Sequence, residues 1–351
     1  MTSRTVDAAT ARSAELAASI ASRPEAHPML TGDRPTGDLH IGHYLSSLRT
    51  RVDLQNRGVD SYVLIADYQV ITDHDGVGSI KDSTFSLLVD YLAAGIDPAL
   101  STVFTHSALP ALNQLMLPFL SLVALAELQR NPTVKDELRA SRRPLSGLLL
   151  TYPVHQAADI LFCKADVVPV GRDQLPHLEQ TRVIARRFNA AYADEKPVFP
   201  EPSALINDQQ LILGVDGEKM SKSRGNAITL AASADETANL ITRARTDAEQ
   251  LVTYEPERRP EVANLLTIAA GFTGSSPEEL ATGLGASGGR GLKALVIEAV
   301  NEGLREHRRR RLELSRDRGF LQGVLRTGNA RAEAVAAQTL TEVRAAMSMD
   351  Y

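Results

Sequence analysis

Two histidines, His40 and His43, lie three residues apart at the start of a predicted helix, just after a turn rich in glycine and proline. The stretch Thr31 to Leu48 reads TGDRPTGDLHIGHYLSSL. A helix N-terminus presents free backbone N–H groups and the positive end of the helix dipole, which together attract phosphate. Side chains three residues apart share one helix face, so both imidazoles can reach one ligand. A phosphate site, a metal site and an ordinary capped helix are the three interpretations that this stretch allows.

The metal interpretation is the weakest of the three. The chain has no HExxH sequence, and the stretch offers no third ligand residue. The only cysteine is Cys163, which excludes an internal disulfide and a zinc site built from several cysteines. We therefore predict no metal ligands, and a reducing compartment such as the cytoplasm.

A second polar stretch, Gly214 to Asn226, reads GVDGEKMSKSRGN and holds two lysines within four residues, Lys219 and Lys222. Only seven of the 38 basic residues are lysines, so two of them so close together stand out. Alone, such a loop is usually a solvated surface loop. Combined with the histidine turn, and in this order along an α/β chain, it is a strong signal that favours the phosphate interpretation of that turn.

The elements that would position these groups follow an alternating order. Residues 61–72 and 101–107 are apolar, β-branched runs typical of buried parallel strands, and residues 85–97 and 112–130 have helical periodicity, with a kink or restart at Pro118. Alternating strands and helices predict an α/β fold with a parallel sheet. Ligands of such sheets bind beyond the carboxyl ends of the strands.

Three segments are expected along the 351 residues. Residues 1–27 predict a short helical or disordered extension, residues 28–228 an α/β nucleotide-binding domain, and residues 229–351 an all-helical domain. No apolar run approaches the length of a membrane helix. The net charge of −5 neither indicates nor excludes nucleic-acid binding, which depends on local patches.

The two stretches carry a family resemblance. The tetrad His40-Ile41-Gly42-His43 and the pentad from Lys219 to Ser223 match, letter for letter, the HIGH and KMSKS signatures of class I aminoacyl-tRNA synthetases. The resemblance implies a Rossmann-like sheet, ATP as a substrate with Mg²⁺, and a helical anticodon-binding domain. It implies catalytic roles for His40, His43, Lys135, Lys219 and Lys222.

The same resemblance implies an ATP site formed by the glycine-rich turn, a strand-to-helix turn at residues 171–174, and the lysine loop. The implied ATP-binding residues are Asp33, Arg34, Pro35, Thr36, Gly42, His43, Gly171, Asp173, Gln174, Lys219, Met220, Ser221, Lys222 and Ser223.

Residues 147–189 resemble tryptophanyl-tRNA synthetases most closely, especially in AADIL and VPVGRDQLPHLEQTR. Tyr152, Gln156 and Asp159 are spaced so that one helix face presents three polar groups. The surrounding residues are apolar, so the carboxylate is expected to be buried and to need a partner. In the family the matching acid accepts the indole N–H. The implied tryptophan-binding residues are Ala66, Gln69, Tyr152, Gln156, Asp159 and Gln174.

The resemblance implies a tryptophan–tRNA ligase that forms tryptophanyl-AMP and pyrophosphate from L-tryptophan and ATP, and then charges tRNA(Trp). Tyrosyl-tRNA synthetases, a sister family, use a similar helix face and are the alternative. A non-catalytic paralogue that binds tryptophan or a partner is a second alternative. A nucleotidyltransferase with an HxGH turn is a third, but it would lack the lysine loop.

Several positions depart from the commoner bacterial tryptophanyl enzymes. The first signature is a full HIGH where many have a TIGN-like sequence, Arg34 replaces Gln, Gln69 replaces His, and Gln156 replaces Met. This pattern resembles a second, auxiliary bacterial form. We hypothesise an altered indole pocket that tolerates indole-like antibiotics.

The tRNA and a second subunit are the expected macromolecular partners. The segment from Arg305 to Arg318 is strongly basic, and in an appended helical domain it predicts phosphate contacts, above all through Arg308 to Arg311. Family members are homodimers, which the resemblance carries over. We expect no membrane association.

Overall fold

The computed structural model describes residues 3–72, 79–132, 134–135, 138, 144–193, 195–206, 212–221 and 224–351. Side chains are described within these ranges except those of residues 3–9, 72 and 173. Among these residues, no helix combines the length and apolar character needed to cross a membrane.

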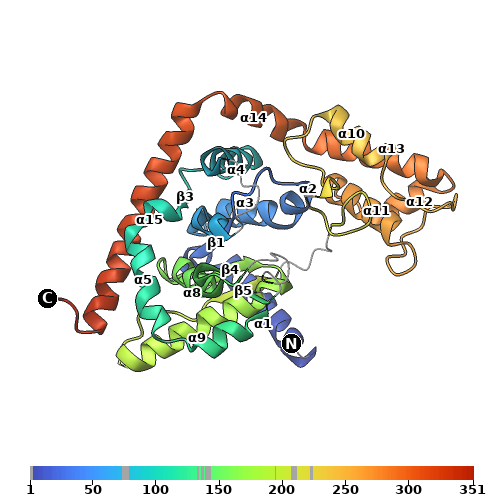
Figure 1. The fold of residues 1–351 in the computed structure, drawn as a ribbon. Coiled ribbons are helices and arrows are strands. Elements are labelled where there is room, and N and C mark those ends of the chain that lie inside the picture. The colour runs from blue at the N-terminus through green and yellow to red at the C-terminus, as the bar shows by residue number, and fades with distance from the viewer. Residues whose placement is uncertain are drawn as a thin grey trace.

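Five parallel strands form the central sheet in the order β3-β2-β1-β4-β5 (Figure 1). The strands are β1 (Met29–Asp33), β2 (Ser61–Ile65), β3 (Ser101–Thr105), β4 (Val167–Val170) and β5 (Ser203–Ile206). Chain order reverses between β1 and β4, so the topological switch point lies at the end of β1. The predicted Rossmann-like α/β class is confirmed.

Helices cover both faces of the sheet. Successive residues of a strand point to opposite faces, so each strand contributes side chains to two hydrophobic cores. Val63 and Ile65 of β2 join one hydrophobic core, whereas Tyr62 and Leu64 join the other. The helices of this part are α1 (Ser3–Ser22), α2 (Ile41–His43), α3 (Arg49–Asn56), α4 (Ile80–Ala94), α5 (Pro110–Leu120), α6 (Leu125–Arg130), α8 (Gly147–Leu161) and α9 (Leu175–Tyr192). Strand β2 is shorter than predicted, because the chain turns at Ala66 into a 3₁₀ helix at Tyr68–Thr72.

The described part of the chain after residue 233 forms helices without strands, as predicted. They are α10 (Ala234–Thr242), α11 (Pro260–Thr273), α12 (Pro277–Leu284), α13 (Gly288–Gly303), α14 (Arg305–Ser315) and α15 (Arg318–Ala346). Helices α10 to α13 form a group at one end of the molecule, α14 crosses α4, and α15 runs back along β3 and α5 (Figure 1). One hydrophobic core extends from Leu88 of α4 to Leu265 and Val296 of this helical part.

Both edges of the sheet are covered by a helix that supplies a hydrogen bond to the edge strand. The Thr105 backbone N–H of β3 donates to Asn329 Oδ1 of α15 at 2.9 Å. The Ile206 backbone N–H of β5 donates to Ser13 Oγ of α1 at 2.8 Å. Helix α1 also buries Leu16 and Ile20. The N-terminal segment is thus a packed helix, and exposed strand edges, which invite pairing with other chains, are blunted.

The close approach of α15 to β3 depends on Gly328. A Cβ at this position would lie 1.8 Å from the Val103 carbonyl oxygen, whereas a Cβ at Gly323 of the same helix would meet nothing within 4 Å. We expect Gly328→Ala to lower the free energy of unfolding by about 2 kcal/mol through overpacking. The matched change Gly323→Ala should raise it by up to about 1 kcal/mol, since alanine favours helix. Urea unfolding measures both, and equal effects would contradict this account.

Candidate functional site

Three groups of predicted site residues follow the carboxyl ends of parallel strands, and a fourth strand ends beside them. Arg34 to Thr36 follow β1, Ala66 and Gln69 follow β2, and residues 171–174 follow β4. Strand β3 ends at Thr105, and His106 comes directly after it. Because all strands run parallel, these carboxyl ends meet at one edge of the sheet.

The HIGH tetrad caps the helix that follows β1. Helix α2 begins at Ile41, and the His40 backbone N–H donates to His43 Nδ1 at 3.3 Å. Since Nδ1 accepts, a neutral His43 carries its proton on Nε2, where it can be donated to a ligand. The two rings lie 3.8 Å apart between centroids. Gly42 is needed here, because a Cβ would lie 2.9 Å from His40 Nδ1.

Backbone pairing brings the segment that follows the second signature beside the first signature. The Ile41 N–H donates to the Ile228 carbonyl at 2.9 Å, and the Leu230 N–H donates to the Leu39 carbonyl at 2.8 Å. The segment 228–230 begins two residues after the stretch that contains the KMSKS pentad. The HIGH tetrad is therefore a neighbour in space of the segment that follows the KMSKS pentad, although 176 residues separate His43 from Lys219.

Within the KMSKS pentad, Lys219 is exposed and Met220 is buried in the core. The Ser221 N–H donates to Asn226 Oδ1 at 2.7 Å, and Asn226 Nδ2 donates to Asp216 Oδ1 at 2.8 Å. Met220 thus anchors the loop by packing, which does not support the expected ATP contact through its side chain. Lys222 and Ser223 lie outside the described residues.

The glycine-rich turn begins with a half-buried acid, Asp33, which pairs with a buried arginine. Its Oδ2 accepts from Arg51 Nη1 at 2.6 Å and from the Tyr91 hydroxyl at 2.7 Å. Burial by itself raises the pKa of Asp33, but the charge and hydrogen bond of Arg51, with smaller effects of His43 and Tyr91, lower it to about 2. The carboxylate thus ties the turn to Arg51 and Tyr91. This geometry argues against the expected contact of the Asp33 side chain with ATP.

The other predicted nucleotide contacts differ in their exposure to solvent. Arg34 is half-buried, Pro35 is buried and Thr36 is exposed. Lys135 is exposed. In the turn after β4, Gly171 is exposed and Gln174 is half-buried at the start of α9, while the side chain of Asp173 lies outside the described residues.

The predicted polar face of α8 is present, but its buried members have protein partners. The Tyr152 hydroxyl lies 3.2 Å from His177 Nε2 of α9. Asp159 is 1% exposed, and its Oδ1 lies 2.8 Å from His106 Nε2. Gln156 is half-buried on the same helix. Sequence reasoning expected a partner for the buried acid and took it to be the substrate, whereas the structure supplies His106.

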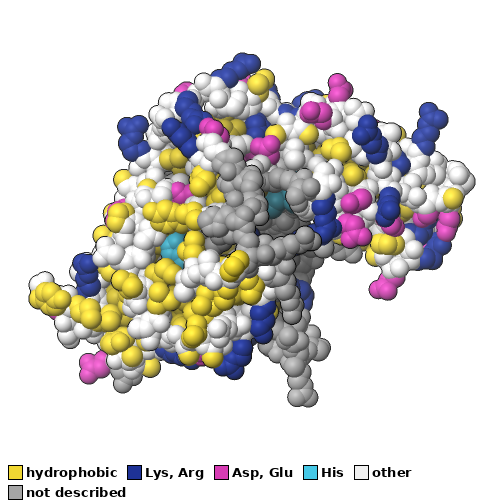
Figure 2. Space-filling model, in the orientation of Figure 1, with side chains coloured by type: hydrophobic (Ala, Val, Ile, Leu, Met, Phe, Trp, Pro, Cys, Tyr) yellow, Lys and Arg dark blue, Asp and Glu magenta, His cyan; other side chains and the backbone are white. Residues whose placement is uncertain are grey.

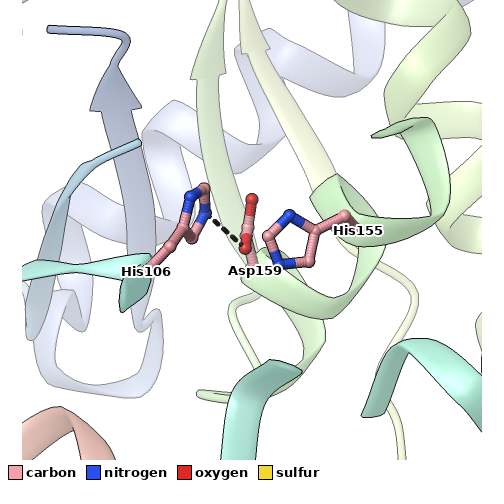
Figure 3. Close-up of side chains that lie close together, drawn as sticks. All are labelled: His106, His155 and Asp159. Carbon is pink, nitrogen blue, oxygen red and sulfur yellow. Dashed lines mark hydrogen bonds and ion pairs between the residues drawn. The ribbon is translucent and has the colours of Figure 1, made fainter. Parts of the chain in front are cut away.

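Histidine 106 was missed because residues 101–107 read as one strand, within which a lone histidine is unremarkable. Figure 3 shows His106 reaching Asp159 from the end of β3, with His155 beside it on α8. One ligand atom from each lies within 4.8 Å of the others, so the group also has the composition of a metal site. Burial lowers the pKa of His155, which therefore stays neutral near pH 7.

The basic residues of α14 mostly bind the protein itself. Arg311 Nε donates to Asp90 Oδ1 at 2.8 Å, and Asp90, which is 0% exposed, also accepts from the Leu39 N–H at 3.1 Å. Arg308 donates to the Ala232 carbonyl and Arg309 pairs with acids of its own helix. These contacts give Arg308 and Arg311 structural roles, in contrast to the predicted tRNA contacts.

Parallel strands, ligand groups at their carboxyl ends and a histidine-bearing helix N-terminus define the class of nucleotide-binding α/β proteins. The family described as tRNA synthetases class I (W and Y) matches residues 24–305. The chain belongs to this family.

Three relatives show the extent of the similarity. The tryptophan–tRNA ligase of Clostridium longisporum is 41% identical over 334 residues, which cover 92% of this chain and 97% of that protein. The tryptophan–tRNA ligase of Lactococcus lactis subsp. lactis is 39% identical over 92% of this chain and 98% of its own length. The crystal structure of tryptophanyl-tRNA synthetase from Campylobacter jejuni, complexed with ADP and tryptophan, has a TM-score of 0.80 and 29% identity. The match covers 92% of this chain and 99% of that one.

The Asp33–Arg51 pair is expected to dominate the stability of the nucleotide edge. Asp33→Asn leaves the Arg51 guanidinium buried without its counter-charge, and should lower the free energy of unfolding by about 3 kcal/mol at pH 7. Asp53→Asn, which breaks the exposed Asp53–Arg57 pair, should cost less than about 1 kcal/mol.

The difference in the free energy of unfolding between the wild type and Asp33→Asn should also depend on pH. Because the folded-state pKa of Asp33 is lowered from 3.8 to about 2, its contribution is complete above about pH 4 and is lost as the pH falls toward 2. The difference between wild type and Asp33→Asn should therefore shrink over that interval. A difference that stays constant from pH 7 to 2 would contradict the assigned pair.

Proposed function

We propose that the chain is a tryptophan–tRNA ligase, which activates L-tryptophan with ATP to tryptophanyl-AMP and pyrophosphate and then charges tRNA(Trp). The observation that carries this proposal is the pairing of Leu39–Ile41 with Ile228–Leu230, which places the HIGH helix beside the segment that follows the KMSKS loop. The relatives named above, similar over 92% of the chain, support tryptophan as the amino acid.

In the proposed first step, the tryptophan carboxylate attacks the α-phosphorus of ATP and pyrophosphate leaves. His40 and His43 would donate hydrogen bonds to the triphosphate at the helix N-terminus, and Lys135, Lys219 and Lys222 would stabilise the negative charge of the leaving group. The exposure of Lys135 and Lys219 supports these roles, since their ammonium groups are accessible to a ligand. Such positioning, without acid–base chemistry, is the main requirement of attack at phosphorus.

Magnesium would enter with the nucleotide, because it prefers oxygen ligands and is commonly held through substrate phosphates. The acid of the turn, Asp33, is bound by Arg51 and Tyr91, so the nucleotide itself is the suitable source of ligands. Mg²⁺ would neutralise part of the triphosphate charge.

For the amino acid, we assign recognition of the indole N–H to Asp159, and contacts with the remainder of tryptophan to Ala66, Gln69, Tyr152, Gln156 and Gln174. Gln69 Nε2 lies 3.4 Å from Asp159 Oδ2, which places this replaced position beside the acid. That contact supports the hypothesis that the indole pocket is altered, as in the auxiliary bacterial form. Equal inhibition of this enzyme and a histidine-bearing homologue by an indole-like antibiotic would contradict the proposed tolerance.

Residues 28–228 would form the catalytic domain and residues 229–351 the part that binds the tRNA anticodon, in a cytoplasmic homodimer. Figure 2 shows hydrophobic side chains gathered over the half of the molecule that holds α5, α8 and α9, whereas charged side chains of both signs cover much of the helical end. Leu117 of α5 is 73% exposed and Leu125 of α6 is 59% exposed. Such an apolar surface supports a subunit interface.

The activity is tested by ATP–pyrophosphate exchange, with tryptophan, with tyrosine and without an amino acid. We expect exchange with tryptophan and none with tyrosine or without an amino acid, because the relatives named above, which match 92% of the chain, are tryptophan–tRNA ligases. Exchange driven by tyrosine would overturn the specificity. Absence of exchange with either amino acid, in a protein that still binds tryptophan, would identify a non-catalytic paralogue.

Variants of the α14 arginines distinguish a role in tRNA binding from a structural role. Arg311→Met should lower the free energy of unfolding by about 3 kcal/mol and slow adenylate formation, because buried Asp90 loses its counter-charge beside Leu39. Arg305→Met, which breaks only the exposed Arg305–Glu302 pair, should change stability by less than about 1 kcal/mol. A normal exchange rate and stability with weakened tRNA charging in Arg311→Met would instead support the nucleic-acid role predicted from sequence.

A further inference from the structure

One buried group of the site has no assigned role. It is His106, the histidine beside Asp159, to which we assign recognition of the substrate. The side chains of His106 and Asp159 are 0% and 1% exposed, and they come from β3 and α8, 53 residues apart. The motifs that identified the family include neither His106 nor its neighbour His155. The two imidazoles therefore need a role of their own.

The backbone around His106 is held from three sides. The Thr105 N–H donates to Asn329 Oδ1, the Ser107 N–H donates to Asp67 Oδ1 at 3.1 Å, and Asn113 Nδ2 donates to the His106 carbonyl at 2.9 Å. Residues on both sides of the histidine are thus fixed by side chains from other parts of the fold. Its ring position is set before any ligand arrives.

The ring of His106 is also confined by its neighbours. It lies 4.5 Å from the His155 ring and 6.2 Å from the stacked ring of Tyr68, between centroids. His155 Nε2 lies 2.8 Å from Asn113 Oδ1, so the second imidazole is bonded to an amide. Only the His106 ring is hydrogen-bonded to Asp159 among these aromatic neighbours.

The two oxygens of Asp159 are held unequally by the protein. Nε2 of His106 donates to Oδ1 at 2.8 Å, and Nδ1 of His106 is buried without a partner among the described residues. A second N–H at Nδ1 would be buried unsatisfied, so the arrangement favours the neutral Nε2–H tautomer. The described contact of Oδ2 is a hydrogen bond at the long limit, 3.4 Å from Gln69 Nε2.

We propose that His106 is a positioning residue for amino-acid recognition: by holding Oδ1 of Asp159, it turns Oδ2 toward the substrate and sets the preference for a side chain that bears an N–H donor. This inference rests on the proposed function, in which Asp159 accepts the indole N–H. A carboxylate free to rotate would satisfy itself with other donors, and the site would lose discrimination against analogues that lack the donor.

The test compares tryptophan with benzothienylalanine, an analogue of similar shape in which sulfur replaces the indole N–H. The kcat/KM ratio of the two in ATP–pyrophosphate exchange, and their Kd ratio by calorimetry, report how much the N–H is recognised. In His106→Leu, we expect both ratios to fall about tenfold, the effect of one hydrogen bond to a charged group, with the KM for ATP unchanged. His106→Gln retains an amide N–H of similar reach, and should preserve most of the preference.

His155→Leu is the matched control, because it removes an equally buried imidazole that bonds Asn113 rather than Asp159. It should lower affinity for both amino acids alike and leave the ratios unchanged. Unchanged ratios in both His106→Leu and His106→Gln would overturn the proposal, as would stoichiometric zinc in the purified wild-type protein, since Nε2 would then be a metal ligand. Failure of the proposed function is distinct: it shows in the wild type, as absence of tryptophan-driven exchange, while the Kd ratios still test His106.

Discussion

The backbone hydrogen bonds between Leu39–Ile41 and Ile228–Leu230 are the interaction on which the nucleotide site depends. They join the first helix turn after β1 to the segment that follows the lysine loop, although the two lie far apart in the chain. Backbone pairing fixes register without specifying side chains. The pairing therefore holds the main chain of the HIGH turn and of this segment in a fixed relative position.

Three carboxylates, Asp33, Asp90 and Asp159, then determine the shape of the site. Each is paired with a cationic or imidazole group: Arg51 for Asp33, Arg311 for Asp90, and His106 for Asp159. A buried carboxylate is tolerated only when it is paired or hydrogen-bonded, so each pair fixes the relative position of the elements that carry it. Asp33 supports the glycine-rich turn, Asp90 links the HIGH segment to α14, and Asp159 links α8 to the end of β3, where we propose that it binds the amino acid.

The helical part of the chain is continuous with the catalytic core. Arg311 of α14 reaches the acid that binds Leu39, and Asn329 of α15 bonds the last residue of β3, next to His106. A change in the position of α14 would therefore affect the HIGH segment, and a change in the position of α15 would affect the backbone beside His106. This arrangement gives the C-terminal helices a part in shaping the active site in addition to the tRNA contacts proposed for this region.

The sequence by itself determined the parallel α/β class and the helical C-terminal part, because periodicity is a local property, and the letters of HIGH and KMSKS indicated the family. It also indicated that Asp159 is buried and needs a partner. The identity of that partner depended on the tertiary structure, since His106 stands alone in a short strand-like run. Tertiary structure likewise decided that Asp33 binds Arg51 and that Arg311 binds Asp90. A charge pattern shows that a helix is basic, but only packing shows whether the charges meet solvent, nucleic acid or a buried carboxylate.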